Sequence, residues 1–167
     1  CNVIISDDGL QHYALHRDIE VAVIDGKIRL GNEFCLPAGA LREPAKRLDK
    51  VDFIVANGEP QENEFAMRYS ISHACNLIDS TRNIPLEEFK GKQVHAVAGI
   101  GNPDRFFNQL SDLGIDVIAH PFPDHYFYKE ADLEFEDKKP VLMTEKDAVK
   151  CKRIARENFW YVPISVE

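Results

Sequence analysis

Two adjacent carboxylates follow an apolar run at the start of the chain. Residues 2–6 are mostly apolar, Asp7 and Asp8 come directly after them, and Gln11 and His12 lie within the next turn. An apolar strand that ends in acidic residues is typical of a Walker B strand, whose carboxylates face the crevice where phosphates and Mg²⁺ bind. Because Mg²⁺ takes one or two carboxylates and keeps most of its water, Asp7 and Asp8 are candidate ligands, with Gln11 beside them. Asp-Asp-Gly is also ordinary turn chemistry, and this alternative stays open.

A second candidate loop carries an arginine and a glutamate side by side. Residues 36–44 read LPAGALREP, so Arg42 and Glu43 stand on a proline-bounded, rigid segment. An arginine at such a place can neutralise a phosphate, and a glutamate can approach a metal ion directly or through water. A surface ion pair beside a proline turn is the alternative reading of the same two residues.

One histidine has the setting of a functional group. His125 lies in the proline-stiffened loop HPFPDHY, residues 120–126, next to an acid and after a predicted strand. This position favours an acid/base or orienting role, although a structural role fits the same residues. His16, His73 and His95 lack such a context, and we interpret them as structural or surface residues.

A Walker B strand works together with a phosphate-binding loop of the pattern GxxxxGK[ST]. The 167 residues contain no such pattern, and Gly91-Lys92 is followed by Gln93. If residues 2–6 form a Walker B strand, the phosphate loop belongs to a preceding part of the protein. We therefore expect the chain to be the C-terminal part of a longer protein.

Apolar and β-branched runs predict the strands that would position these loops. We expect strands at 2–6, 21–24 and 51–55 in one parallel sheet. The alternating residues 65–72, together with 74–78, predict a small antiparallel connector.

Beyond residue 92 the pattern changes to regular alternation of strands and helices. A helix over 103–113 is indicated by Asn102 as its N-cap, Pro103 as its first residue and Gly114 as its stop. The remaining predicted elements are strands at 94–100, 115–119, 140–144 and 159–164, and helices near 129–135 and 145–157. Strands separated by single helices imply a parallel sheet.

The predicted fold class is therefore α/β, in three parts. Residues 1–60 are expected to be the C-terminal part of an α/β domain with a P-loop-type parallel sheet. Residues 61–91 would be a short antiparallel β connector or hinge, and residues 92–167 a small C-terminal α/β domain with a mostly parallel sheet.

Composition restricts the class of protein further. Hydrophobic residues make up 44% and charged residues 29%, as in a globular protein with a core, and the formal charge is −8. This negative charge argues against binding to a nucleic-acid backbone. No apolar stretch approaches the roughly 18–20 residues of a membrane span, and four scattered cysteines without a CxxC pair indicate a reducing, cytosolic setting.

Five motifs occur in a recognisable order: DDGLQH at 7–12, LPAGALREP at 36–44, GIGNPDRFF at 99–107, FPDHY at 122–126 and TEKDAVK at 144–150. In this combination the chain resembles the C-terminal half of the tetraacyldisaccharide 4′-kinases, the lipid A 4′-kinases of Gram-negative bacteria.

The resemblance implies a P-loop kinase that transfers the γ-phosphate of ATP, with Mg²⁺, to the 4′-hydroxyl of an acylated glucosamine disaccharide 1-phosphate. It implies that residues 1–60 are the C-terminal part of a nucleotide- and Mg²⁺-binding kinase domain. It also implies that Asp7, Asp8, Gln11 and Glu43 belong to the Mg²⁺-nucleotide site and that Arg42 lies near the phosphates. His125 would match the histidine that supports the catalytic aspartate. The family is also expected to sit peripherally on the cytoplasmic face of the inner membrane through an N-terminal helix outside these residues.

The residues at hand lack the family's phosphate loop and catalytic aspartate, so we expect no kinase activity from this chain alone. Two other functions remain open. One is a Mg²⁺-dependent phosphohydrolase with Asp7 as nucleophile, although such an enzyme would usually have its second acid at position 9, which is Gly9. The other is a non-catalytic α/β binding module.

Overall fold

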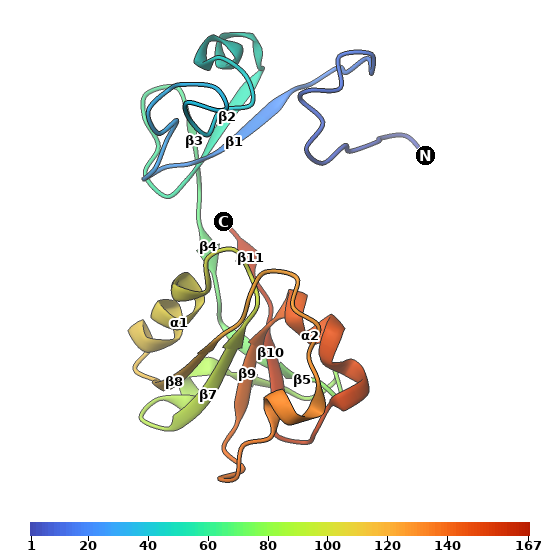
Figure 1. Cartoon of the computed structure of the whole chain (residues 1–167), viewed down its shortest axis with the longest axis vertical. Helices are drawn as coiled ribbons and strands as arrows, with labels where there is room; N and C mark the ends of the chain where they lie inside the picture. Colours follow the sequence, from blue (N-terminus) through green and yellow to red (C-terminus); the bar gives the residue numbers. More distant parts are fainter. The chain divides into compact units, whose positions relative to one another are not determined.

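The structure is a computed structural model that describes all residues from 1 to 167 (Figure 1). It contains two compact units, which we describe separately: the N-terminal unit, residues 1–69 with 166–167, and the C-terminal unit, residues 70–165. Both units are built on parallel β-sheets, so the predicted α/β class is confirmed. None of the helices has the length and hydrophobicity that crossing a membrane would require.

The N-terminal unit contains an all-parallel sheet of strands β1 (Val21–Asp25), β2 (Phe53–Asn57) and β3 (Phe65–Met67), in that spatial order. The predictions at 21–24 and 51–55 are confirmed, the second with a shift of two residues. Of the residues expected in an antiparallel connector, those of β3 pair in parallel with β2, whereas the strand at 73–76 has antiparallel neighbours. A 3-10 helix, η1 (Ala45–Lys50), follows the 36–44 loop.

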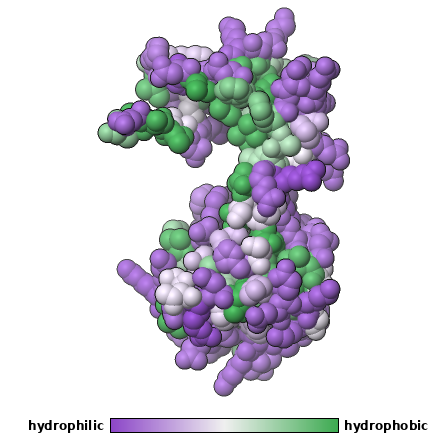
Figure 2. Space-filling model, turned by 180° about the vertical axis from the view of Figure 1, so that it is seen from behind, coloured by the Kyte–Doolittle hydropathy of each residue, from purple (hydrophilic) through white to green (hydrophobic).

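One face of this three-stranded sheet is uncovered. Ala22 and Ala56 are buried on the covered face, whereas on the other Val23 and Phe65 are 60% and 58% exposed. A groove of about 440 Å³ lies on the exposed face, and Figure 2 shows hydrophobic residues at the surface of this unit. Parallel sheets are normally covered on both faces, so this apolar face lacks the helices or strands that would usually pack against it.

The predicted strand at residues 2–6 is not formed. These residues adopt no regular structure, and Val3, Ile4 and Ile5 are 73%, 89% and 91% exposed. A strand exists only when its backbone groups pair with a neighbouring strand. No strand of the chain pairs with this segment, so the apolar pattern alone is not sufficient to form one.

The C-terminal unit is built on a six-stranded sheet in the order β6-β5-β10-β9-β7-β8. The four strands from β10 to β8 are parallel, and β5 and β6 add an antiparallel edge. The four strands predicted beyond residue 92 are thereby confirmed. The bounds are β5 His73–Asn76, β6 Asn83–Pro85, β7 Gln93–Ala98, β8 Asp116–Pro121, β9 Val141–Thr144 and β10 Phe159–Val162.

The helices of this unit begin and end close to the predicted signals. Helix α1 (Pro103–Asp112) is capped by Asn102, whose side chain accepts a hydrogen bond from Arg105 N, and Gly114 follows with φ of 79°. Helix α2 (Glu145–Cys151) is shorter than predicted and continues as the 3-10 helix η4 (Lys152–Ile154). The other 3-10 helices are η2 (Leu86–Phe89) and η3 (Glu130–Leu133), the latter in place of the helix predicted near 129–135.

The core lies on both faces of the six-stranded sheet. Along β7, Val94 and Ala96 belong to the cluster that includes Phe106 and Leu110 of α1, whereas Val97 packs with the cluster on the α2 side. The helices therefore cover opposite faces (Figure 1). This arrangement brings the carboxyl ends of β7, β8 and β9 to one edge of the sheet.

The division into a domain at 1–60, a hinge at 61–91 and a C-terminal domain at 92–167 stays a prediction. In terms of packing, part of the expected connector belongs elsewhere, since β5 and β6 extend the six-stranded sheet. The boundary between the compact units falls within β4 (Tyr69–Ser70) and β11 (Ser165–Val166), which form a two-stranded sheet.

Candidate functional site

The structure brings the two predicted loops of the N-terminal unit together. Arg42 Nη1 lies 2.7 Å from Asp8 Oδ2, and Gln11 Nε2 donates a hydrogen bond of 2.9 Å to Glu43 Oε2. The residues of each pair are 34 and 32 positions apart in the sequence. Four of the candidate residues, identified on separate motifs, therefore form one cluster.

The 36–44 loop has a backbone that places Arg42 and Glu43 at this cluster. A β-carbon on Gly39 would lie 2.2 Å from both the Phe34 carbonyl oxygen and Asn32 Oδ1, so only glycine fits there. Leu36 N also donates to the carbonyl of Leu41 at 2.9 Å, which closes the loop on itself. The glycine of this motif is thus required by close backbone packing.

The 7–12 loop is held by its own turn and by an arginine. Asp8 has φ of 51°, His12 N donates to the Gly9 carbonyl at 3.0 Å, and Arg17 Nη1 donates to the same carbonyl at 2.5 Å. Gly9 is buried, whereas Asp7, Asp8 and Gln11 are exposed. The turn chemistry considered for Asp-Asp-Gly is therefore present, and it presents the carboxylates to solvent.

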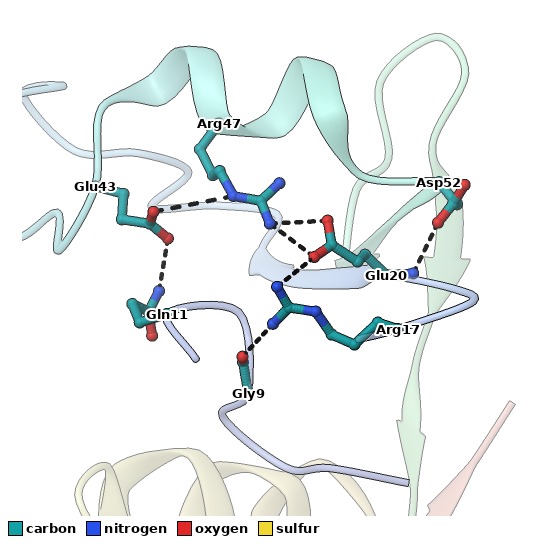
Figure 3. A network of polar contacts seen from close by, with 7 residues as sticks. All are labelled: Gly9, Gln11, Arg17, Glu20, Glu43, Arg47 and Asp52. Carbon is teal, nitrogen blue, oxygen red and sulfur yellow. Dashed lines mark hydrogen bonds and ion pairs between the residues drawn. The ribbon is translucent and has the colours of Figure 1, made fainter. Parts of the chain in front are cut away.

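Behind these loops lies a charged network that the sequence analysis did not identify (Figure 3). Arg17 Nη2 lies 2.9 Å from Glu20 Oε1, and Arg47 Nη2 lies 2.8 Å from Glu20 Oε2. Arg47 Nε also lies 3.9 Å from Glu43 Oε1, and both side chains are mostly buried. The spacings of three residues in Arg17–Glu20 and four in Glu43–Arg47 were the available signal.

The donor chemistry of the cluster fits Mg²⁺, which prefers oxygen ligands. Asp7 has no hydrogen bond or ion pair, Asp8 is paired with Arg42, and Glu43 accepts from Gln11. No group of three or more histidine, cysteine or acidic side chains is close enough to hold a metal ion. Because Mg²⁺ needs only one or two carboxylates, the residues fit such an ion by type.

His125 lies in the C-terminal unit, in the loop after β8. It has φ of 60°, its N–H donates to Asp124 Oδ1 at 3.0 Å, and its side chain is 90% exposed. Its Nε2 is 3.7 Å from Asp124 Oδ2. The imidazole is therefore oriented by its own turn and accessible to a partner.

His95 has the structural role assigned to it, in a cluster that the sequence did not reveal. His95 Nδ1 lies 2.9 Å from His120 Nε2, and His95 Nε2 lies 2.9 Å from Asp137 Oδ1. The His95 ring stacks on Phe135 with centroids 3.8 Å apart. Burial and the neighbouring His95 lower the pKa of His120.

The C-terminal unit also contains a cavity of about 290 Å³ between η3, the 135–138 segment and the start of β10. Leu133, Phe135 and Phe159 line it, together with Lys138 and Arg156. None of the predicted site residues borders this cavity.

The fold and the clustered loops define an α/β protein in which each unit contains parallel strands and the N-terminal unit joins two charged loops. Its entire length, residues 1–167, matches the family model of tetraacyldisaccharide-1-P 4′-kinase. The chain belongs to this family, and the family resemblance seen in the five motifs is confirmed.

Relatives and a solved structure support this membership. The chain is 58% identical to a tetraacyldisaccharide 4′-kinase of Nitrosococcus oceani, over 99% of this chain and 49% of the relative. It is 55% identical to that of Methylobacillus flagellatus, over 100% of this chain and 50% of the relative. A crystal structure of LpxK from Aquifex aeolicus in complex with ATP is similar with a TM-score of 0.70 and 30% identity, over 96% of this chain and 51% of that one. The chain spans about half the length of the curated relatives it matches.

Proposed function

We propose that this chain forms part of an ATP-dependent kinase that phosphorylates the 4′-hydroxyl of a tetraacylated glucosamine disaccharide 1-phosphate. Its family and the names of its relatives support this activity. The observation that carries the proposal is the convergence of the 7–12 and 36–44 loops, which joins Gln11 to Glu43 and Asp8 to Arg42. Oxygen ligands and a guanidinium side by side suit a metal ion and the phosphates that it accompanies.

Asp7, Asp8, Gln11 and Glu43 would hold Mg²⁺ and Arg42 would contact the phosphates of ATP. The ion, when bound, would neutralise phosphate charge during transfer. The Asp8–Arg42 pair is exposed, with side chains 69% and 61% accessible, so it contributes little to stability. Each partner therefore remains available to a ligand of opposite charge.

His125 would orient a catalytic aspartate that lies outside this chain. Its exposed ring and the carboxylate of Asp124 beside it support this role. Because the substrate is acylated, the complete enzyme would work at a membrane surface, and we propose the cytoplasmic face of the inner membrane. Contact with the bilayer would be made by residues outside this chain.

A chimaeric enzyme provides the test, with this chain in place of the matching half of the Nitrosococcus oceani relative. Transfer of phosphate from ATP to tetraacyldisaccharide 1-phosphate is measured, with the chain alone as the inactive reference. His125→Ala should lower kcat about 10²- to 10⁴-fold with a smaller change in the KM for ATP. Glu43→Gln should lower activity, whereas Lys46→Ala, an exposed neighbour, should not. Wild-type kcat in both His125→Ala and Glu43→Gln would refute these assignments.

The same preparations distinguish the alternatives. Release of phosphate by the chain alone, with a trapped phospho-aspartate at Asp7, would favour a phosphohydrolase. A chimaera without transferase activity, containing a folded chain that still binds a ligand, would favour a binding module.

A further inference from the structure

The turn that presents His125 rests on a buried polar contact at the carboxyl edge of the six-stranded sheet. Gly99 follows β7, the loop of residues 122–128 follows β8, and Thr144 ends β9. Asp147 lies in the first turn of α2, directly after Thr144. These segments come from three strands and meet at one place.

Asp147 joins the segment after β7 to the end of β9. Its carboxylate is completely buried and accepts hydrogen bonds from Thr144 Oγ1 at 2.7 Å, Gly99 N at 2.9 Å and Lys150 Nζ at 3.0 Å. A buried carboxylate is tolerated only with such a set of donors. The β9–α2 turn is therefore tied to the β7–α1 turn through one side chain.

Gly99 is also the point at which the His125 loop packs on this junction. A β-carbon there would lie 2.6 Å from the Tyr128 hydroxyl, 3.1 Å from Asp147 Oδ1 and 3.2 Å from the Pro123 carbonyl oxygen. Gly101, two residues on, would meet nothing within 4 Å. The absence of a side chain at position 99 thus permits the His125 loop to approach the backbone closely. No such approach occurs at position 101.

Tyr128 fixes the far end of the loop in the same place. Its hydroxyl oxygen is buried, and burial next to the Asp147 carboxylate raises the pKa of Tyr128. Its ring packs edge-on against Phe122 and Tyr126, with centroids 5.0 Å and 5.3 Å away. Tyr128 is therefore held by packing between these aromatic rings and the junction at Gly99.

His125 is restrained by the residues of its own turn. It occupies a turn in which Tyr126 N donates to the Pro123 carbonyl at 3.2 Å, and its side chain is in solvent. The position of the turn, and with it that of the His125 backbone, is consequently set by Pro123 on one side and by the aromatic residues on the other.

We propose that Asp147, Gly99 and Tyr128 form a positioning unit that holds the His125 turn at the edge of the sheet. None of the three needs to touch a substrate. Asp147 fixes the Gly99 backbone, and Gly99 allows Pro123 and Tyr128 to pack against it. The catalytic consequence rests on the proposed role of His125, whereas the positioning itself does not.

The structural part is tested in the 167-residue chain by hydrogen exchange of the Tyr126 amide and by NMR of the His125 imidazole. Gly99→Ala should accelerate exchange of Tyr126 about tenfold and shift the His125 signals, because the new β-carbon displaces Tyr128 and Pro123. Gly101→Ala is the matched control and should change neither. Trp160 fluorescence verifies that each variant is folded. Unchanged exchange and unchanged His125 signals in folded Gly99→Ala would overturn the proposal.

A double variant distinguishes a specific clash with Tyr128 from an unspecific effect of the added methyl group. Tyr128→Phe removes the hydroxyl, the atom nearest to the new β-carbon, so Gly99→Ala with Tyr128→Phe should regain most of the protection of Tyr126. A double variant as perturbed as Gly99→Ala would exclude Tyr128 from the unit.

The kinetic part uses the chimaeric kinase. Gly99→Ala should lower kcat about 10- to 100-fold with the KM for ATP nearly unchanged, since a misplacement of about 1 Å at a reacting centre, here transmitted from His125 to the aspartate it orients, has effects of this size. Gly101→Ala should retain wild-type kcat. If the His125 signals move while kcat stays at the wild-type value, the positioning unit is supported and the proposed role of His125 is refuted.

Discussion

The side-chain amide of Gln11 donates a hydrogen bond of 2.9 Å to Glu43 Oε2 across 32 residues of sequence. Beside it, Asp8 and Arg42 form an ion pair of 2.7 Å. The 7–12 and 36–44 motifs therefore act as one charged surface of the N-terminal unit. Arg47 and Glu20 lie behind this surface as an ion pair, and the Arg47 guanidinium is the cationic neighbour of Glu43.

Arg47 is expected to stabilise the N-terminal unit. Its guanidinium is the cation between Glu20 and Glu43, and Arg47→Met would leave two mostly buried carboxylates without it. The loss should be about 1–3 kcal/mol, measured as faster hydrogen exchange of the β1 and β2 amides. Lys46→Met, on the same 3-10 helix, is the control. Equal exchange in the two variants would show that the network contributes nothing.

Arg42 is expected to act on the nucleotide and not on stability. In the chimaeric kinase, Arg42→Met should lower kcat/KM for ATP about 10- to 100-fold, the equivalent of one charged hydrogen bond. Arg42→Lys should retain part of the activity because it keeps the charge but loses the bidentate geometry. Steady-state kinetics at varied ATP provide the measurement, and an unchanged kcat/KM in Arg42→Met would contradict the assignment.

The His95–His120 pair predicts a loss of stability in mild acid. Burial and the neighbouring His95 lower the pKa of His120, so the unfolded chain binds a proton more readily than the folded one. This contribution to stability is fully present above about pH 6.5 and decreases as the pH falls below that value.

Urea unfolding followed by Trp160 fluorescence between pH 5 and 8 measures this dependence in the C-terminal unit. His120→Gln should make the stability of this unit less dependent on pH in that range. His73→Gln, at a histidine that does not contact His95, should keep the wild-type profile. A profile unaffected by His120→Gln would remove this residue as the cause.

The uncovered face of the β1–β3 sheet predicts self-association of the isolated chain. Val23 is 60% exposed on this face, and exposed apolar patches of this kind promote contacts between molecules. Val23→Lys should lower the apparent mass in light scattering at high concentration. Val149→Lys, at a valine of α2 that is 66% exposed, is the matched control. Equal association of the two variants would indicate a different surface.

Much of the C-terminal unit could be predicted because its signals are local. Asn102 caps α1 through a contact three residues away, and Gly114 ends it in a left-handed conformation. The apolar run that includes Val94 and Ala96 to Ala98 precedes a helix signal, which is typical of a strand in a parallel sheet that is buried on both faces. The length of α2 was overestimated, since η4 continues it with a similar residue pattern.

The predicted strand at residues 2–6 shows where local signals are insufficient. Its β-branched residues have the propensity for a strand, but they remain exposed because no other strand pairs with them. β-propensity describes a single segment, whereas a strand forms only when at least two segments pair.

The α/β class, the order of the five motifs and the types of residue that carry the chemistry could be read from the amino acids in order, because these features depend on neighbours within a few positions. Folding of the whole chain joined Gln11 to Glu43, placed Arg47 behind them and buried Asp147 at the junction with Gly99. The hydrogen bond between Gln11 and Glu43 joins residues 32 positions apart, and the one between Gly99 and Asp147 joins residues 48 positions apart. Both depend on how the strands between these residues pack. Propensity and spacing contain no information about that packing, whose free energy arises from burial and from the satisfaction of buried polar groups.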